Sequence, residues 1–292
     1  WLLRDRVGEK PLYYGFVGNS FVFASEIGCI AALPDFSCPV NRDVLGIYMI
    51  YGYIPAPHTV YEGIFKLEPG KLLRARAPFR EFVQETWWSM ADVAARGQAH
   101  PFSGTLTEAP LELERLMMEA VREQMVADVE LGAFLSAGID STSVVSLMQA
   151  QSDRKVKTFT IGMEEEGYDE AKAAEAIARH LGTEHTTLYI TQEDARRVLP
   201  GLARMFGEPF ADSSQIPTYL VSSLTRQHVT VSLSGDGGDE LFCGYGTYAS
   251  VGRAWERIRR IPAPLRRKLG NALAEGALSG SEENRIRGRL LG

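Results

Sequence analysis

Cysteine is scarce in this chain, and the positions of the cysteines exclude two common kinds of site. Only Cys29, Cys38 and Cys243 occur among 292 residues. They have neither the paired spacing of a zinc site nor the density of a disulfide-stabilised secreted domain. His180 and His185 flank a short turn, and their spacing suits no common metal motif. We therefore interpret the cysteines as buried or incidental thiols and the two histidines as residues of a helix end and a strand start.

Long apolar runs and an excess of positive charge are also missing. No stretch approaches the roughly 20 apolar residues of a membrane helix, and no charged segment precedes an apolar run at the start, as in a secretory signal. A formal net charge of -6 argues against a general nucleic-acid surface. The basic cluster at residues 253–268 is interpreted as a solvated helix face, with a local basic patch as the alternative. We expect a cytoplasmic protein with no nucleic-acid and no membrane partner.

The composition that remains is that of a globular protein long enough for two domains, with 45% hydrophobic and 23% charged residues. Residues 1 to about 75 alternate apolar and polar positions with Gly-rich turns, which is typical of hairpins. Residues 91–110 are polar and interrupted by Gly and Pro, so we place a linker there. Over residues 111–292 helix-like and strand-like segments alternate, which predicts a parallel sheet with right-handed crossovers.

The expected elements follow from apolar periodicity. In the first part we expect a helix over residues 42–49 and a pair of strands at 65–67 and 71–73. In the second part we expect helices at 111–126 and 170–181, strands at 131–135, 156–162, 186–190 and 229–233, and two further helices before the last strand.

Two short runs of small residues and carboxylates carry most of the functional information. The first is Ser-Ala-Gly-Ile-Asp-Ser-Thr at residues 136–142, and the second is Ser-Gly-Asp-Gly-Gly-Asp-Glu at residues 234–240. Each follows a strand-like run and precedes a helix-like one. In an open parallel sheet such turns lie at the carboxyl ends of strands, where ligands bind, and the N–H groups of a helix start attract phosphate. We predict that one nucleotide contacts both loops.

The charges in these loops predict a metal ion as well. The first run lacks the lysine of the common P-loop, so positive charge must come from elsewhere. Asp140, Asp236 and Asp239 would repel each other and the phosphates unless a hard cation lies between them, and Mg²⁺ prefers carboxylates, phosphate oxygens and water. The alternative is that both runs are only helix starts, with Ser136 or Asp140 as N-cap. The presence of two such runs in one α/β domain favours the magnesium nucleotide site.

A family resemblance rests on these motifs. Residues 136–141 resemble the Ser-Gly-Gly-x-Asp-Ser loop of the PP-loop ATP pyrophosphatases, and residues 234–242 resemble the second signature of glutamine-dependent asparagine synthetases. Residues 4–14 and 23–26 are similar to the closing strands of that family's class II glutaminase domain. The resemblance implies the C-terminal part of an α+β Ntn-type glutaminase domain at 1–90 and an incomplete α/β ATP-pyrophosphatase domain at 111–292. We expect a chain truncated at both ends, without the glutaminase cysteine.

The resemblance implies a two-step reaction with small-molecule substrates. The side chain of aspartate attacks ATP to give β-aspartyl-AMP and pyrophosphate, and glutamine-derived ammonia then displaces AMP to give asparagine. Carried over by position, Asp236 orients the acyl intermediate and Asp239 acts with it at the reacting centre. Asp140 and Asp239 bind Mg²⁺. The implied ATP and pyrophosphate contacts are Phe134, Ser136, Gly138, Asp140, Ser141, Thr142, Ile161, Ser234 and Gly235.

Departures from the family pattern leave alternatives open. Ala137 stands where the family usually has a second glycine, in a turn for which we expect a positive φ that is costly for a residue with a Cβ. Cys243 also replaces a glycine, with a smaller expected consequence. Residues 208–215 would form a wall of the acceptor site or only a helix-capping loop, and they contain no cation.

Three functions therefore remain. Asparagine synthesis leads, and the second possibility is the same chemistry with another carboxylate acceptor, as in β-lactam synthetase relatives. The third is a degenerate nucleotide-binding protein without turnover, which the replacement of glycine by Ala137 suggests. A homodimer is left open.

Overall fold

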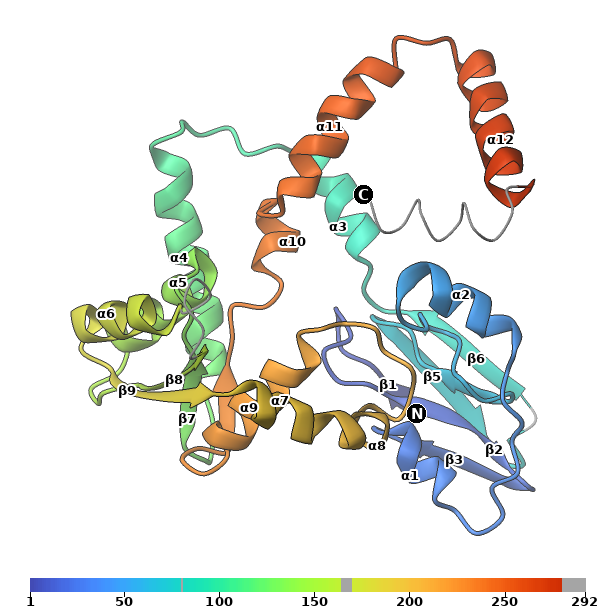
Figure 1. Ribbon diagram of the computed structural model, residues 1–292, viewed down its shortest axis with the longest axis horizontal. Helices are drawn as coiled ribbons and strands as arrows, with labels where there is room; N and C mark the ends of the chain where they lie inside the picture. The colour runs from blue at the N-terminus through green and yellow to red at the C-terminus, as the bar shows by residue number, and fades with distance from the viewer. Residues whose placement is uncertain (80, 164–169, 280–292) are drawn as a thin grey trace. The chain divides into compact units, whose positions relative to one another are not determined.

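The computed structural model describes residues 1–79, 81–163 and 170–279 (Figure 1). The chain divides into two compact units, Trp1–Ser234 and Gly235–Gly292, which are described separately. Within the described ranges, none of the helices combines the length and the apolar character needed to cross a bilayer.

The first unit opens with two small antiparallel sheets. One has the strand order β3-β2-β4 and the other the order β1-β5-β6. The strands are β1 (Leu2–Leu3), β2 (Tyr13–Val17), β3 (Ser20–Ala24), β4 (Ile64–Lys66), β5 (Lys71–Arg76) and β6 (Glu81–Thr86), and the helices are α1 (Ile27–Ala31) and α2 (Asp43–Tyr51). Side chains from β2, β4 and α1 form the buried core of this part: Tyr13, Val17, Ile27, Ile30 and Ile64.

The helix expected at 42–49 is confirmed, but the expected pairing of strands 65–67 and 71–73 is wrong. β4 pairs with β2, whereas β5 pairs with β1 and β6. The connection between β4 and β5 is bonded to the segment between β1 and β2. Leu67 N–H donates to Leu12 O at 2.9 Å, and Gly70 N–H donates to Asp5 O at 2.8 Å. Gly70 has a φ of 65°. These bonds turn the chain from one sheet into the other.

A four-stranded parallel sheet forms the second part of the first unit, as the alternation of elements predicted. Its strand order is β10-β7-β8-β9, and each neighbouring pair is parallel. The strands are β7 (Leu131–Phe134), β8 (Lys157–Met163), β9 (Glu184–Ile190) and β10 (Val231–Leu233). All four lie where the sequence placed strands, with ends that differ by one or two residues.

Helices cover both faces of this sheet (Figure 1). α4 (Glu108–Gln124) packs on α5 (Ile139–Ala150), and α5 and α6 (Ala171–Leu181) pack on the strands from one side. On the other side lie α7 (Gln192–Val198) and α9 (Gln215–Thr225). The core between α4, α5, α6 and the strands includes Val121, Ala133, Leu135, Val145, Met148, Ala174 and Ala178. Helices on both faces explain why the strands read as apolar runs.

One connection differs from the sequence expectation, and the predicted linker contains a helix. Between β9 and β10 the chain forms α7, a short 3-10 turn (Leu199–Gly201), α8 (Leu202–Phe206) and α9, rather than two helices. The predicted linker at 91–110 is helical over much of its length, since α3 (Met90–Ala99) occupies it. Ser89 caps α3 by accepting a hydrogen bond from Asp92 N–H at 3.2 Å, so a local signal outweighs the polar composition.

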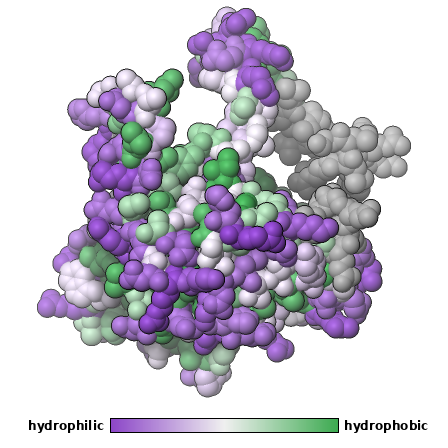
Figure 2. All heavy atoms as spheres, turned by 90° about the vertical axis from the view of Figure 1, so that its left-hand side faces the viewer, coloured by the Kyte–Doolittle hydropathy of each residue, from purple (hydrophilic) through white to green (hydrophobic). Residues whose placement is uncertain are grey.

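The second unit contains α10 (Gly238–Phe242), α11 (Gly246–Ile258) and α12 (Ala263–Ser279). Most basic residues of the 253–268 cluster are exposed on α11 and α12, and Arg266 lies over the Trp255 ring at 5.0 Å. Figure 2 shows one face of the molecule, where hydrophilic residues cover much of the surface and hydrophobic residues gather in patches between them. The helix-face interpretation of the basic cluster agrees with this exposure.

Candidate functional site

The site begins where the order of the strands reverses. From β7 the chain proceeds outward to β8 and β9, and it then returns to place β10 on the opposite side of β7. The register pairs Leu233 with Ala133, so β7 and β10 end at the same edge of the sheet. Ligands of open α/β sheets bind at this kind of topological switch point, outside the carboxyl ends of the strands. Residues 136–142 and Ser234, the last residue of the first unit, follow these two strand ends.

The loop at residues 136–142 is held together by its own hydroxyl groups. The Ser141 hydroxyl is the hub: it accepts a hydrogen bond from Ser136 N–H at 3.1 Å and lies 2.9 Å from the Ser136 hydroxyl. It also lies 3.2 Å from Gly138 O, to which Thr142 Oγ1 donates at 2.8 Å. Ser141 is 8% exposed. The loop is therefore ordered by bonds among the residues predicted to bind pyrophosphate.

The start of α5 supplies donors for an anion. Gly138 is the N-cap of this helix, with Asp140 in the first turn. The first N–H groups of a helix have no partner inside the helix and carry the positive end of the helix dipole. Together with the small side chains around them, they form a surface that a phosphate group can approach closely.

The backbone at Ala137 corrects one expectation. Among the described residues, the only non-glycine residues with a positive φ are Phe79 and Cys243. Ala137 is not among them, because the loop turns through an extended Gly138 with φ -74° and ψ 152°. Of the two positions where a family glycine is replaced, the left-handed one is Cys243, the C-cap of α10, with φ 58° and ψ 38°. The expected strain at Ala137 is therefore wrong, and the substitution at Cys243 has the larger conformational consequence.

Phe134 and Ile161 lie at the same edge of the sheet as the loop. Phe134 is the last residue of β7 and is paired with Phe159 of β8. Ile161 lies two residues further along β8, and both side chains are half-buried. This edge is the one at which the resemblance puts adenine and ribose, but their contacts with a nucleotide stay a prediction.

The second loop belongs mostly to the second unit. Gly237 has a φ of 89° and is the N-cap of α10, so this glycine is required by the turn. The Asp239 carboxylate lies against Gly244, where a Cβ would collide with Oδ1. The Tyr245 hydroxyl donates a hydrogen bond to Glu240 at 2.9 Å, and this bond raises the pKa of Tyr245 to about 12. The roles predicted for Gly235, Asp236 and Asp239 stay predictions.

The described residues hold no ready-made metal cluster. Nowhere in residues 1–79, 81–163 and 170–279 do three or more His, Cys, Asp or Glu side chains gather as a possible metal site. Mg²⁺ that arrives with a nucleotide needs only one or two protein carboxylates, since phosphate oxygens and water supply the other ligands. Asp140 and Asp239 fit that donor set in kind, and the ion itself stays a prediction.

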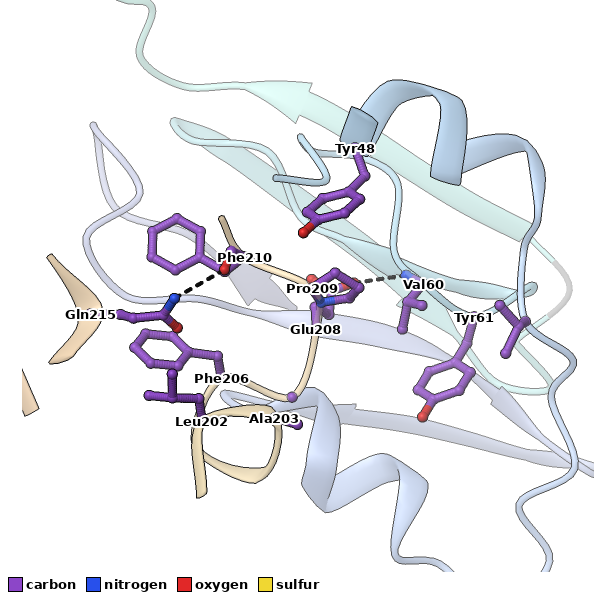
Figure 3. A pocket seen from close by; sticks show the side chains of 12 residues that line it. Tyr48, Val60, Tyr61, Leu202, Ala203, Phe206, Glu208, Pro209, Phe210 and Gln215 are labelled. Atoms are coloured by element: carbon purple, nitrogen blue, oxygen red, sulfur yellow. Dashed lines mark hydrogen bonds between the residues drawn. The ribbon is translucent and has the colours of Figure 1, made fainter. Parts of the chain in front are cut away.

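A pocket of about 400 Å³ lies beside residues 207–214, the connection between α8 and α9. Aromatic rings line it from both parts of the first unit: Tyr48 and Tyr61 from one, Phe206 and Phe210 from the other (Figure 3). Glu208 also contributes to its lining. Residues 208–215 are the segment for which the sequence suggests a wall of the acceptor site or only a helix-capping loop.

An ion pair beside this pocket was missed by sequence reasoning. Glu208 Oε2 lies 2.6 Å from Lys66 Nζ, and the two side chains are 8% and 16% exposed. No motif in the sequence links these two residues. Lys66 is the last residue of β4, and Glu208 lies in the connection between α8 and α9. Only the packing of the two parts of the first unit brings them together.

Other buried titratable groups are structural. Burial, and to a smaller extent the nearby Glu208 carboxylate, raise the pKa of Tyr13 to about 12. Burial likewise lowers the pKa of His185, whose Nδ1 lies 2.9 Å from Thr158 Oγ1. His185 lies in β9 and His180 in the last turn of α6, which agrees with their interpretation as strand and helix-end residues.

The parallel sheet, its switch point and the small-residue loop together define an α/β domain of the ATP-pyrophosphatase type, preceded by part of an α+β domain. A family model described as asparagine synthase matches residues 112–289, and one described as a glutamine amidotransferase domain matches residues 1–88. The first match covers more than half of the chain. The chain belongs to the asparagine synthase family.

Individual relatives agree with this membership. A protein of Methanocaldococcus jannaschii, provisionally named glutamine-hydrolysing asparagine synthetase 2, is 37% identical to this chain over 268 residues. These residues are 90% of this chain and 50% of the relative. Glutamine-hydrolysing asparagine synthetase 1 of Bacillus subtilis is 32% identical over 266 residues, 91% of this chain and 40% of the relative. The chain thus spans half or less of the length of these curated relatives.

Among solved structures, an NH3-dependent NAD synthetase from Campylobacter jejuni has a TM-score of 0.34 and 15% sequence identity, over 47% of this chain and 60% of that chain. This similarity is too low to add to the fold assignment.

Proposed function

We propose that this chain forms the ATP-dependent part of an amide-forming enzyme, with aspartate as the acceptor and asparagine as the product. The observation that carries the proposal is the hydroxyl-ordered loop at residues 136–142, which follows β7 at the topological switch point of the sheet. Membership of the asparagine synthase family supports the choice of reaction. The names of the relatives support glutamine as the source of nitrogen.

The proposed reaction has two balanced steps. In the first, an oxygen of the acceptor carboxylate forms a bond to the α-phosphorus of ATP, and the bond to the departing pyrophosphate breaks. In the second, ammonia forms a C–N bond to the acyl carbon, loses a proton, and AMP leaves with the C–O electron pair. Positioning and electrostatic stabilisation of the phosphate charge would supply most of the rate.

The residues of the first loop would bind the departing pyrophosphate. Backbone N–H groups at the start of α5 would bind the anion without the help of a lysine. The hydroxyls of Ser136, Ser141 and Thr142 would exchange their bonds within the loop for bonds to phosphate oxygens. A Cβ at Gly138 would lie 3.1 Å from Ser136 Oγ and would crowd this hydroxyl of the loop. Phe134 and Ile161 would contact adenine and ribose, and Ser234 and Gly235 would contact the nucleotide from the second loop.

Asp140 and Asp239 would hold Mg²⁺, which when bound neutralises phosphate charge during transfer. Asp236 would orient the acyl intermediate for attack by ammonia, and Asp239 would act beside it. In the proposed domain organisation, residues 1–90 belong to a glutaminase domain, residues 91–110 form a linker and residues 111–292 belong to the synthetase domain. Cytoplasmic location and a homodimer are further proposals.

A second acceptor is favoured by one observation. Residues 207–214 contain no Lys or Arg, although the carboxylate of an amino-acid acceptor usually demands a cation. An acceptor with a different charge pattern, as in β-lactam formation, fits this absence. Identification of the amide product separates the two functions.

The test is calorimetric titration of the chain with ATP and Mg²⁺, beside the variants Asp140→Asn and Asp153→Asn. Asp153 is exposed beyond the other end of α5 and serves as the matched control. We expect micromolar binding by the parent and the Asp153→Asn control, and a loss of at least about tenfold for Asp140→Asn. Pyrophosphate release with aspartate then tests the chemistry. Equal binding by all three proteins would contradict the assigned metal and phosphate contacts.

A further inference from the structure

The connection at residues 207–214 lies at the functional edge of the parallel sheet. It leads into α9, which packs on β8 and ends at Thr225, shortly before β10 begins at Val231. A crossover helix runs antiparallel to the strands that it connects. The N-terminal end of α9 therefore lies toward the carboxyl ends of the strands, the edge that carries residues 136–142.

Three contacts hold this connection to the first part of the unit. Both oxygens of the Glu208 carboxylate are used: Oε2 lies 2.6 Å from Lys66 Nζ, and Oε1 accepts a hydrogen bond from Val60 N–H at 2.7 Å. A backbone bond follows, in which Ala211 N–H donates to Gly52 O at 2.7 Å. Figure 3 shows the bond between Glu208 and Val60 as a dashed line among the residues that line the pocket.

The ion pair makes this arrangement specific. Glu208 is almost completely buried, so its charge needs both partners. Removing one partner of such a pair leaves an uncompensated buried charge, and outward movement of the connection into water restores the solvation of that charge. Lys66 is fixed in turn, because its Nζ also donates to the Ile54 carbonyl. The backbone before Glu208 is equally confined: Gly207 has a φ of 67°, and a Cβ there would lie 2.8 Å from Ile27 Cγ2.

We propose that Lys66 and Glu208 are positioning residues of the synthetase site. They hold residues 207–214 in one conformation at the edge where the acceptor binds, so the first part of the unit shapes the acceptor site even when free ammonia replaces glutamine. The catalytic consequence rests on the proposed function. The ordering of the connection does not.

The ordering is tested by amide hydrogen exchange of residues 207–214 in Lys66→Met and in the control Lys71→Met. Lys71 lies in β5 of the same part, and its Nζ makes an exposed bond to Thr86 Oγ1. We expect Lys66→Met to increase exchange of the connection by about tenfold and Lys71→Met to leave it unchanged. Equal exchange in the parent and Lys66→Met overturns the proposal.

The catalytic consequence is tested by steady-state kinetics of the protein with ammonium as nitrogen donor. Lys66→Met is expected to raise the KM for the acceptor about fivefold while kcat and the KM for ATP change by less than about twofold. Lys66→Arg, which keeps the charge, is expected to restore the acceptor KM. A fall in kcat at unchanged KM would mean only a smaller folded fraction and would overturn the positioning role. If the parent releases no pyrophosphate with any carboxylate, the proposed function fails, while hydrogen exchange still decides whether Lys66 orders the connection.

Discussion

Replacing Ala137 and Cys243 separately by glycine is expected to change stability in opposite directions. Ala137 is not among the residues with a positive φ, whereas Cys243 has a left-handed backbone with φ 58°. Both side chains are exposed, so little packing is lost with either. The two variants therefore compare the same kind of change at a relaxed and at a strained position.

The magnitudes follow from two opposing contributions. Ala137→Gly is expected to lower the free energy of unfolding by about 0.4–1 kcal/mol, because glycine widens the unfolded ensemble. Cys243→Gly carries a similar entropic cost, but it removes left-handed strain of about 1–2 kcal/mol. The entropic contribution is common to both variants. Their difference therefore isolates the strain, about 1–2 kcal/mol in favour of Cys243→Gly.

Urea-dependent hydrogen exchange, resolved by peptide, measures the two effects where they occur. The peptides that contain α5 report on Ala137, and those that contain α10 report on Cys243. Gly182→Ala is a useful control, since Gly182 has a φ of 75° and a methyl group added there would meet nothing within 4 Å, and it should lose about 1–2 kcal/mol. A gain of about 1 kcal/mol or more for Ala137→Gly would refute the described loop geometry and revive the degenerate, non-enzymatic interpretation.

Three further predictions concern hydrogen bonding, pH and close contact. Ser141→Ala is expected to lower the free energy of unfolding by about 1–3 kcal/mol, since it leaves a loop N–H group without its acceptor; an unchanged urea midpoint would contradict the hydroxyl-centred loop. Burial lowers the pKa of His185 in the folded protein, so the unfolded chain takes up the proton first as the pH falls. The contribution of neutral His185 to the free energy of unfolding is therefore present above about pH 6.5 and is lost as the pH falls below that value. His185→Gln should remove that loss, and parallel pH profiles of the two proteins would argue against it. Gly244→Ala should displace the Asp239 carboxylate and slow pyrophosphate release by about tenfold or more, whereas Gly246→Ala, with open space around it, should not; equal rates would exclude the contact.

The parallel sheet was predictable because its signals are local. The run Leu131–Phe134 is followed by a small-residue turn and then by the helical pattern of α5, and the same succession of strand, turn and helix recurs along residues 131–233. Each helix must cross back over the sheet to reach the next strand, so a parallel arrangement follows from the order of elements alone. The antiparallel part was less predictable. Strands β4 and β5 are close in sequence, but the bonds made by residues 67–70 direct them into different sheets.

The candidate site divides in the same way. The residue types at 136–142 predict a loop that approaches phosphate, and the structure orders that loop through Ser141. The same residues misled us about the backbone. A glycine missing from a motif indicates strain only if the turn has a positive φ at that position, and Gly138 and the start of α5 supply the turn without one.

The sequence by itself determined the class of fold, the two loops and the family, because periodicity, turn residues and motifs lie within short segments. Only the tertiary structure decided which strands pair, and that a buried carboxylate at Glu208 bonds to residues up to 148 positions away. These outcomes depend on contacts between distant segments. Such contacts form only when burial of apolar surface repays the conformational entropy lost in bringing those segments together, and no local pattern records them.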